Sequence, residues 1–287
     1  MPPAVALFVS LTLFSTMLAL GLSLRLEAVR SWCHRPALPL RVLLGSCVLV
    51  PLLALLVLQL PWTAALSPSA RIAIALMALC PSAPLAMRKA RKAGGDHQLA
   101  ALVQVGAALA AVISVPLLAL LFRRSFALAG WEIRSLDVAL QVGQVQLLPL
   151  LLGLAIRRWR PAWAERLEAP LNRAANLLLL VLFSLVLLKA GPQLLVFARS
   201  NGLALLVMLL LAAAALLIGR LLALPDSSHG ATTALVTAMR NPGLALLFAS
   251  RHGQGLPALK IGIVAYVLVT VLASLPLMQR QRLGRTA

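Results

Sequence analysis

Long apolar runs separated by short polar links form the main pattern of the chain. A helix needs about 20 apolar residues to cross a hydrocarbon core about 30 Å thick. Backbone groups in lipid must find their hydrogen bonds within the chain, so each run predicts a helix. The sequence predicts nine spans, near Ala4–Leu24, Leu40–Leu60, Ile72–Met87, Gln98–Phe122, Val138–Ile156, Ala174–Leu188, Gly202–Leu224, Ala231–Ser250 and Ile261–Met278. The predicted fold class is all-α, a single polytopic membrane domain over residues 1–287.

Two of these spans are interrupted by proline in a similar way, the third within Cys80–Pro84 and the eighth within Met239–Gly243. Proline removes a backbone donor and clashes with the preceding turn, so both helices should break. The two lie five spans apart and therefore cross in opposite directions, which predicts inverted halves at 1–122 and 174–278, joined by a linking span at 138–156. Broken helices at matching places in inverted repeats indicate the central site of a secondary transporter. Two ordinary proline kinks are the alternative.

Composition excludes a soluble fold. The chain is 61% hydrophobic and 11% charged, against about 45–50% and about 25% in soluble domains. The net charge of +19 is carried by links between apolar runs, where it indicates topology and affinity for the lipid bilayer rather than nucleic acid. If the N-terminus is outside, most lysines and arginines fall in cytoplasmic links. This predicts an integral protein of the plasma (inner) membrane with its N-terminus outside and its C-terminus in the cytoplasm.

Residues that could carry out catalysis or proton transfer are absent from the middle of the spans. All acids and histidines fall in links or near span ends, so no mid-membrane carboxylate is available for a proton relay. HExxH, GxSxG and P-loop motifs do not occur. The sequence therefore predicts no enzyme, no cofactor and no metal site, and a non-transporting membrane receptor or scaffold stays open as an alternative.

Arg240 is the most informative single residue. It lies ten residues from either end of its span, which is roughly 15 Å at the rise of an α-helix. An arginine at that depth is costly and normally functional. No acid lies at comparable depth, so its partners should be helix C-terminal carbonyls, water or the negative charge of a substrate. The alternative is a residue that faces a wet cavity without a specific ligand.

Several short motifs occur in a characteristic order along most of the chain. They are Cys80-Pro81-Ser82-Ala83, Gly95-Asp96, Pro116 within a long helix, Pro149 and Gly153 ahead of Arg157, and Val236 to Ala245 in the eighth span. In order and spacing they resemble the bile acid:sodium symporter family. That family carries Cys-Pro-Gly-Gly-x-x-Ser-Asn in its first broken helix and Glu-x-Gly-x-Gln-Asn-x-Gly-Leu-Ala in its second.

The resemblance implies a core domain, in which the two broken helices cross, and a panel domain. It also implies where sodium ligands would lie. Matched position by position, the family's ligands fall on Ala86, Met87, Ala100, Gln104, Val236 and Arg240. Only Gln104 offers a side-chain oxygen, and a guanidinium repels sodium. The usual sodium sites are therefore expected to be missing, although backbone carbonyls at the breaks remain as potential ligands.

The sequence predicts a secondary transporter that moves a small organic solute, an anion rather than a cation, by alternating access and without sodium. A conventional sodium-coupled symporter with relocated ligands is the alternative. The predicted substrate-binding residues are Pro81, Ser82, Pro84, Gln104, Arg240, Asn241, Pro242 and Gly243.

Overall fold

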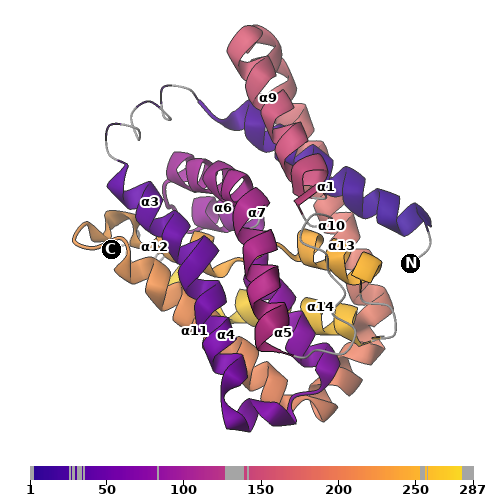
Figure 1. The fold of residues 1–287 in the computed structure, drawn as a ribbon. Coiled ribbons are helices and arrows are strands. Elements are labelled where there is room, and N and C mark those ends of the chain that lie inside the picture. The colour runs from indigo at the N-terminus through magenta and orange to yellow at the C-terminus, as the bar shows by residue number, and fades with distance from the viewer. Residues whose placement is uncertain are drawn as a thin grey trace.

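The computed structural model describes residues 3–25, 27, 30, 34, 36–82, 84–126, 139–140, 142–252, 256 and 258–279. Within these ranges every regular element is helical (Figure 1), which confirms the all-α prediction. The α-helices are α1 (Pro3–Ser23), α3 (Ala37–Leu44), α4 (Val50–Gln59), α5 (Pro68–Leu79), α6 (Pro84–Lys92), α7 (His97–Ser125), α9 (Leu148–Trp159), α10 (Pro161–Ser200), α11 (Gly202–Leu221), α12 (Gly230–Ala238), α13 (Pro242–His252) and α14 (Leu259–Ala273). Short π-helical turns, η1 (Gly45–Leu49) and η3 (Gly143–Leu147), precede α4 and α9, and short 3-10 turns occur at η2 (Pro61–Ala65) and η4 (Ser227–His229).

The described helices include five that are long and apolar enough to cross a membrane. They are Ala37–Gln59, His97–Ser125, Pro161–Leu188, Gly202–Leu221 and Leu259–Gln279, and shorter apolar helices cover Leu7–Ser23 and Pro68–Leu79. These lengths confirm a polytopic membrane protein. The count of nine spans and the inverted halves stay predictions. The start of the predicted fifth span, with residues 127–138 and 141, lies outside the described residues.

Helix α10 is far longer than the predicted sixth span. It has 40 residues, whereas the predicted span covers only Ala174–Leu188. Hydropathy marks where a helix lies in lipid, and it does not mark where the helix ends. The flank at 161–173 is rich in Arg, Glu, Leu and Ala, which are good helix formers, so the helix includes it. Pro170 and Pro192 both lie inside α10.

The helices form two groups. Helix α1 packs on α9 and α10, and Figure 1 shows these three together on one side of the molecule; we call them the panel group. Helices α3 to α7 and α11 to α14 form the core group, in which α11 packs on α12, α5 on α14 and α6 on α7. This division agrees with the panel and core domains that the family resemblance implies, and it places both broken helices in the core group.

Two glycines allow α1 and α9 to approach closely. A Cβ atom added at Gly153 would lie 2.5 Å from the carbonyl oxygen of Leu18 and 2.9 Å from the Cα atom of Gly21. Small residues allow membrane helices to pack backbone against backbone. A side chain at this crossing would therefore push the panel group apart.

We expect Gly153→Ala to lower the free energy of unfolding by about 1–3 kcal/mol, the usual effect of overpacking. Gly191→Ala is the matched control, because Gly191 is also inside a helix but has no neighbouring atom within 4 Å of an added Cβ. Alanine there should be neutral or slightly stabilising. Thermal unfolding of both variants tests this, and equal melting temperatures would contradict the close crossing.

Candidate functional site

The two breaks occur at equivalent points and contact each other. Helix α5 ends at Leu79 and α6 begins at Pro84, while α12 ends at Ala238 and α13 begins at Pro242. Proline suits the first position of a helix because its missing N–H has no helical acceptor there. The backbone N–H of Asn241 donates to the carbonyl oxygen of Cys80 at 3.1 Å, from one break to the other. The structure thus brings together the two segments that the sequence singled out.

The Arg240 side chain is 3% exposed and lies at this crossing. Its Nε atom donates to the carbonyl oxygen of Met77 at 3.2 Å, and its Nη2 atom donates to that of Ala78. Its Nη1 atom donates to the carbonyl oxygen of Ser46 at 2.8 Å and to the Oγ atom of Ser46 at 3.2 Å. The guanidinium therefore joins the second broken helix to α5 and to the π-helical turn η1.

These acceptors suit a fixed positive charge. Met77 and Ala78 lie in the last turn of α5, where carbonyls have no partner within the helix and carry its negative dipole end. Ser46 lies in η1, and a π-helical turn often marks a functional place in a helix. Of the partners expected for Arg240, helix C-terminal carbonyls are those present in this conformation. Direct contact of Arg240 with a substrate stays a prediction.

Ser82 and Gln104 fix the first break to α7. The Ser82 Oγ atom donates to Gln104 Oε1 at 2.7 Å, and Gln104 Nε2 donates to the Ser82 carbonyl oxygen at 3.0 Å. Ser82 has a φ angle of 26°, in the left-handed region that glycine adopts most easily. The family motif has glycine at this position, so the break keeps its backbone shape here. Gln104 uses both ends of its amide on Ser82.

Three of the degenerate sodium positions lie in one apolar cluster. Ala86, Ala100 and Val236 are each 1% exposed and pack together, and Met87 packs against them. The cluster joins α3, α6, α7 and α12. Hard cations need several oxygen ligands, and hydrocarbon side chains supply none. At these positions, onto which the resemblance maps sodium ligands of the family, the structure has hydrophobic packing.

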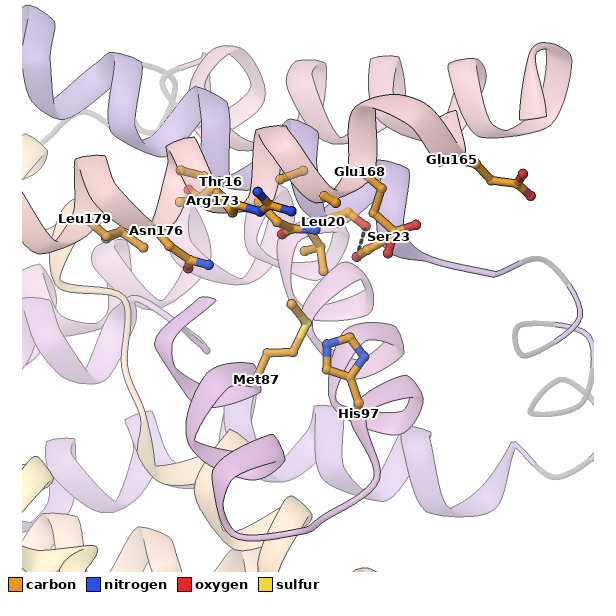
Figure 2. A pocket seen from close by; sticks show the side chains of 14 residues that line it. Thr16, Leu20, Ser23, Met87, His97, Glu165, Glu168, Arg173, Asn176 and Leu179 are labelled. Carbon is orange, nitrogen blue, oxygen red and sulfur yellow. Dashed lines mark hydrogen bonds between the residues drawn. The ribbon is translucent and has the colours of Figure 1, made fainter. Parts of the chain in front are cut away.

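A cavity of about 430 Å³ lies between parts of the panel group and the core group, within the range of about 300–1,000 Å³ typical of small-molecule sites. Thr16, Leu20 and Ser23 of α1 line one side of it. Met87 and His97 of the core group point toward α10 from the opposite side (Figure 2).

Helix α10 supplies the polar wall of this cavity through Asn172, Arg173 and Asn176. Asn172 and Asn176 are four residues apart and so share a helix face. Glu168 also lines the cavity, but its Oε2 atom lies 2.5 Å from Nη2 of Arg157, which compensates its charge. Sequence reasoning missed these α10 residues, because Asn172 and Arg173 precede the predicted sixth span and Asn176 lies in its first turn, before the apolar run begins. Two asparagines at helical spacing beside an arginine were the available signal.

A narrower cavity of about 40 Å³ leads from the large one toward the breaks. Thr16 and Leu179 line both cavities, while Asn241, Pro242 and Gly243 line only the narrow one. Asn241 is 1% exposed, and its Oδ1 atom accepts from the Leu244 N–H at 3.2 Å. Its Nδ2 atom has no partner in the part of the chain that the structure describes.

The remaining predicted site residues are not part of either cavity lining. Arg240, Pro81, Ser82 and Gln104 are buried and line neither cavity. Pro84 is the first residue of α6. The structure thus separates the predicted set into residues beside a cavity and residues that hold the crossing together.

Comparison with known families agrees with this geometry. A family model described as the Sodium Bile acid symporter family matches residues 10–196, which is more than half of the chain. The chain belongs to this family. No curated protein matches the chain.

The match to the sodium bile acid symporter family runs from α1 into α10 and includes the first broken helix. The second broken helix lies beyond the match and contacts the first through the Asn241 N–H and the Cys80 carbonyl oxygen. Membership makes the protein an integral membrane transporter of this type, with a small-molecule substrate and membrane lipid as its partners.

Proposed function

We propose that this transporter moves a small organic anion by alternating access without sodium coupling. The observation that carries the proposal is the placement of Arg240, whose side chain donates to three carbonyl oxygens at the crossing. A guanidinium carries the same single charge as a sodium ion and satisfies carbonyl oxygens by hydrogen bonds. A permanent cation of this kind removes the need for a soluble one.

The apolar cluster around Ala86, Ala100 and Val236 supports the same proposal, because these three positions and Met87 offer no side-chain oxygen, and the oxygen of Gln104 already accepts from Ser82. Burial of a bare ion among hydrocarbon side chains is very unfavourable. A conventional sodium symporter would therefore need ligands in new places.

The choice of an anion rests on donors and on positive charge. Arg173, Asn172 and Asn176 face the large cavity, and the unpartnered Nδ2 atom of Asn241 lies beside the narrow one. Helix α13 begins at Pro242, directly beside the narrow cavity. The N-terminus of a half-helix is the positive end of its dipole and attracts anionic groups in transporters.

The two cavities suggest how access alternates. The large one lies at the end of α1 and the start of α7, which is the cytoplasmic side in the predicted orientation. The narrow one, at about 40 Å³, has room for a few waters at most. A relative movement of the panel and core groups would open this narrow region to the opposite side, as rigid-body rocking does in other transporters.

Purified protein in liposomes tests sodium coupling directly. A bile acid is the first probe, because the family is named for it, and simple carboxylates and sulfates follow. We expect the uptake rate to stay the same when choline replaces sodium at constant ionic strength. A saturable, steep dependence on sodium would favour the conventional symporter, and the absence of uptake for every probe would favour a non-transporting role.

A further inference from the structure

An apolar groove runs along the outside of the molecule between α3, α7 and α9. Leu102, Val105, Gly106 and Leu109 contribute one face of α7 at helical spacing, and the groove encloses about 580 Å³. Leu109 is 45% exposed and Leu40 on the α3 wall is 60% exposed, which is typical of side chains that face lipid. The groove extends about 10 Å along α7, from the rise of 1.5 Å per residue.

The groove becomes polar only at the end of α9, where Arg158 and Trp159 line it. Trp159 is 77% exposed, and tryptophan concentrates at the level of lipid headgroups. The groove thus has an acyl-chain section and an interfacial end.

A charged pocket of about 630 Å³ adjoins this end and shares Arg158 with the groove. Arg157 and Glu168 also line the pocket, but they form an ion pair with each other. The other charged side chains in its lining are Arg25, Arg158, Glu27 and Glu165. Within the described part of the chain none of these four forms an ion pair.

The charges of the pocket therefore balance, with two arginines and two glutamates left to interact with a ligand. Glu165 lines the large cavity as well as this pocket, and Figure 2 shows its side chain pointing away from Met87 and His97. A headgroup with one negative and one positive charge matches such a pocket. A net anionic headgroup would approach both glutamates, and a quaternary ammonium would leave them without hydrogen-bond donors.

We propose that this groove and pocket form a binding site for one phospholipid with a primary ammonium headgroup, of the phosphatidylethanolamine kind. An acyl chain lies in the groove, Arg158 and Arg25 bind the phosphate, and Glu27 or Glu165 accepts hydrogen bonds from the ammonium. In the predicted orientation the lipid belongs to the cytoplasmic leaflet. The site contacts α3 and α7 of the core group and α9 of the panel group, so a bound lipid bridges the two.

The test uses delipidated full-length protein in detergent and measures melting temperature against added dioleoyl phosphatidylethanolamine, phosphatidylcholine and phosphatidylglycerol. We expect phosphatidylethanolamine to give the largest rise at the lowest concentration. Arg158→Gln should weaken its apparent affinity about tenfold, the loss of one charge-assisted hydrogen-bonded contact. Ala155→Phe, which fills the groove, should weaken all three lipids.

Matched variants separate this site from general affinity for lipid. Arg160→Gln removes a neighbouring exposed arginine that lines neither the groove nor the pocket, and Leu148→Phe enlarges an exposed side chain of α9 outside the groove. Both should behave like the parent protein. Glu27→Gln combined with Glu165→Gln should abolish the preference for ethanolamine over choline and leave the groove intact.

Three results would overturn the proposal. The first is equal stabilisation by ethanolamine and choline lipids, and the second is an Arg158→Gln variant that binds as well as the parent. The third is equal binding of soluble phosphoethanolamine, which would show that the groove contributes nothing. Native mass spectrometry of the same samples counts bound lipids, and a single retained phosphatidylethanolamine is the expected result.

Discussion

Arg240→Gln should destabilise the protein more than any other change considered, lowering the free energy of unfolding by about 3 kcal/mol or more. The guanidinium satisfies the carbonyl oxygens of Met77, Ala78 and Ser46. Each buried acceptor left without a donor costs about 1–3 kcal/mol, and a glutamine amide reaches only part of the set. Thermal unfolding in detergent measures the loss. Arg199→Gln is the control, because Arg199 is an exposed arginine at the end of α10.

The same variant tests whether Arg240 takes the place of sodium. Glutamine is the residue of the family motif at this position. The substitution removes the positive charge and leaves helix C-terminal carbonyls that attract cations. We expect sodium to raise the melting temperature of Arg240→Gln above its value in choline at equal ionic strength, and to leave the parent unchanged. Millimolar guanidinium should likewise raise the melting temperature of Arg240→Ala, because the free ion can take the place of the missing side chain.

Arg240→Lys should retain the charge and lose part of the stability. A lysine ammonium is a compact charge with three donors on one atom, whereas the planar guanidinium reaches separate acceptors at once. If the Gln, Ala and Lys variants of Arg240 have the same melting temperature as the parent, the crossing does not depend on a fixed cation. If choline and sodium rescue Arg240→Gln equally, the effect is one of ionic strength.

The burial of Arg240 agrees with its predicted place in the middle of an apolar run, while its depth in the membrane stays a prediction. The identity of its acceptors could not be predicted from the sequence. Ser46 becomes available only through the π-helical turn Gly45–Leu49, and nothing in an apolar run indicates such a turn. The breaks followed from proline chemistry, yet the φ angle of Ser82 and its pairing with Gln104 depend on tertiary contacts.

The sequence did not predict the large cavity between α1, α10 and the core group. Hydropathy detects residues that face lipid, whereas the wall of a water-filled cavity is polar and looks like a link. Asn172 and Arg173 were therefore assigned to the segment before the sixth span, although α10 continues through them, and Asn176 fell in the first turn of that span. In long helices at domain boundaries, polar residues at helical spacing beyond the apolar run deserve the same weight as interruptions within it.

Arg173→Gln should weaken binding of an organic anion about tenfold or more, because Arg173 supplies the cationic side chain of the polar wall that α10 contributes to the cavity. Arg166→Gln is the matched control on the same helix, since Arg166 is exposed and does not line the cavity. The measurement is the concentration of anion that gives half of the maximal thermal shift, followed by uptake into liposomes. Both variants should melt with the parent when no anion is present, because Arg173 makes no ion pair with a described residue.

A second variant separates charge from shape at this position. Arg173→Lys should recover part of the affinity for a monoanion, since the charge remains and the planar pair of donors is lost. Asn176→Ala should cost less than Arg173→Gln, because a neutral hydrogen bond contributes about 0.5–1.5 kcal/mol and a charged one about 1.5–3 kcal/mol. An Arg173→Gln protein that binds and carries anions like the parent would mean that the cavity is selective through the α13 N-terminus alone. In that case Asn241→Ala, which removes the unpartnered Nδ2 donor beside that helix end, should produce the loss instead.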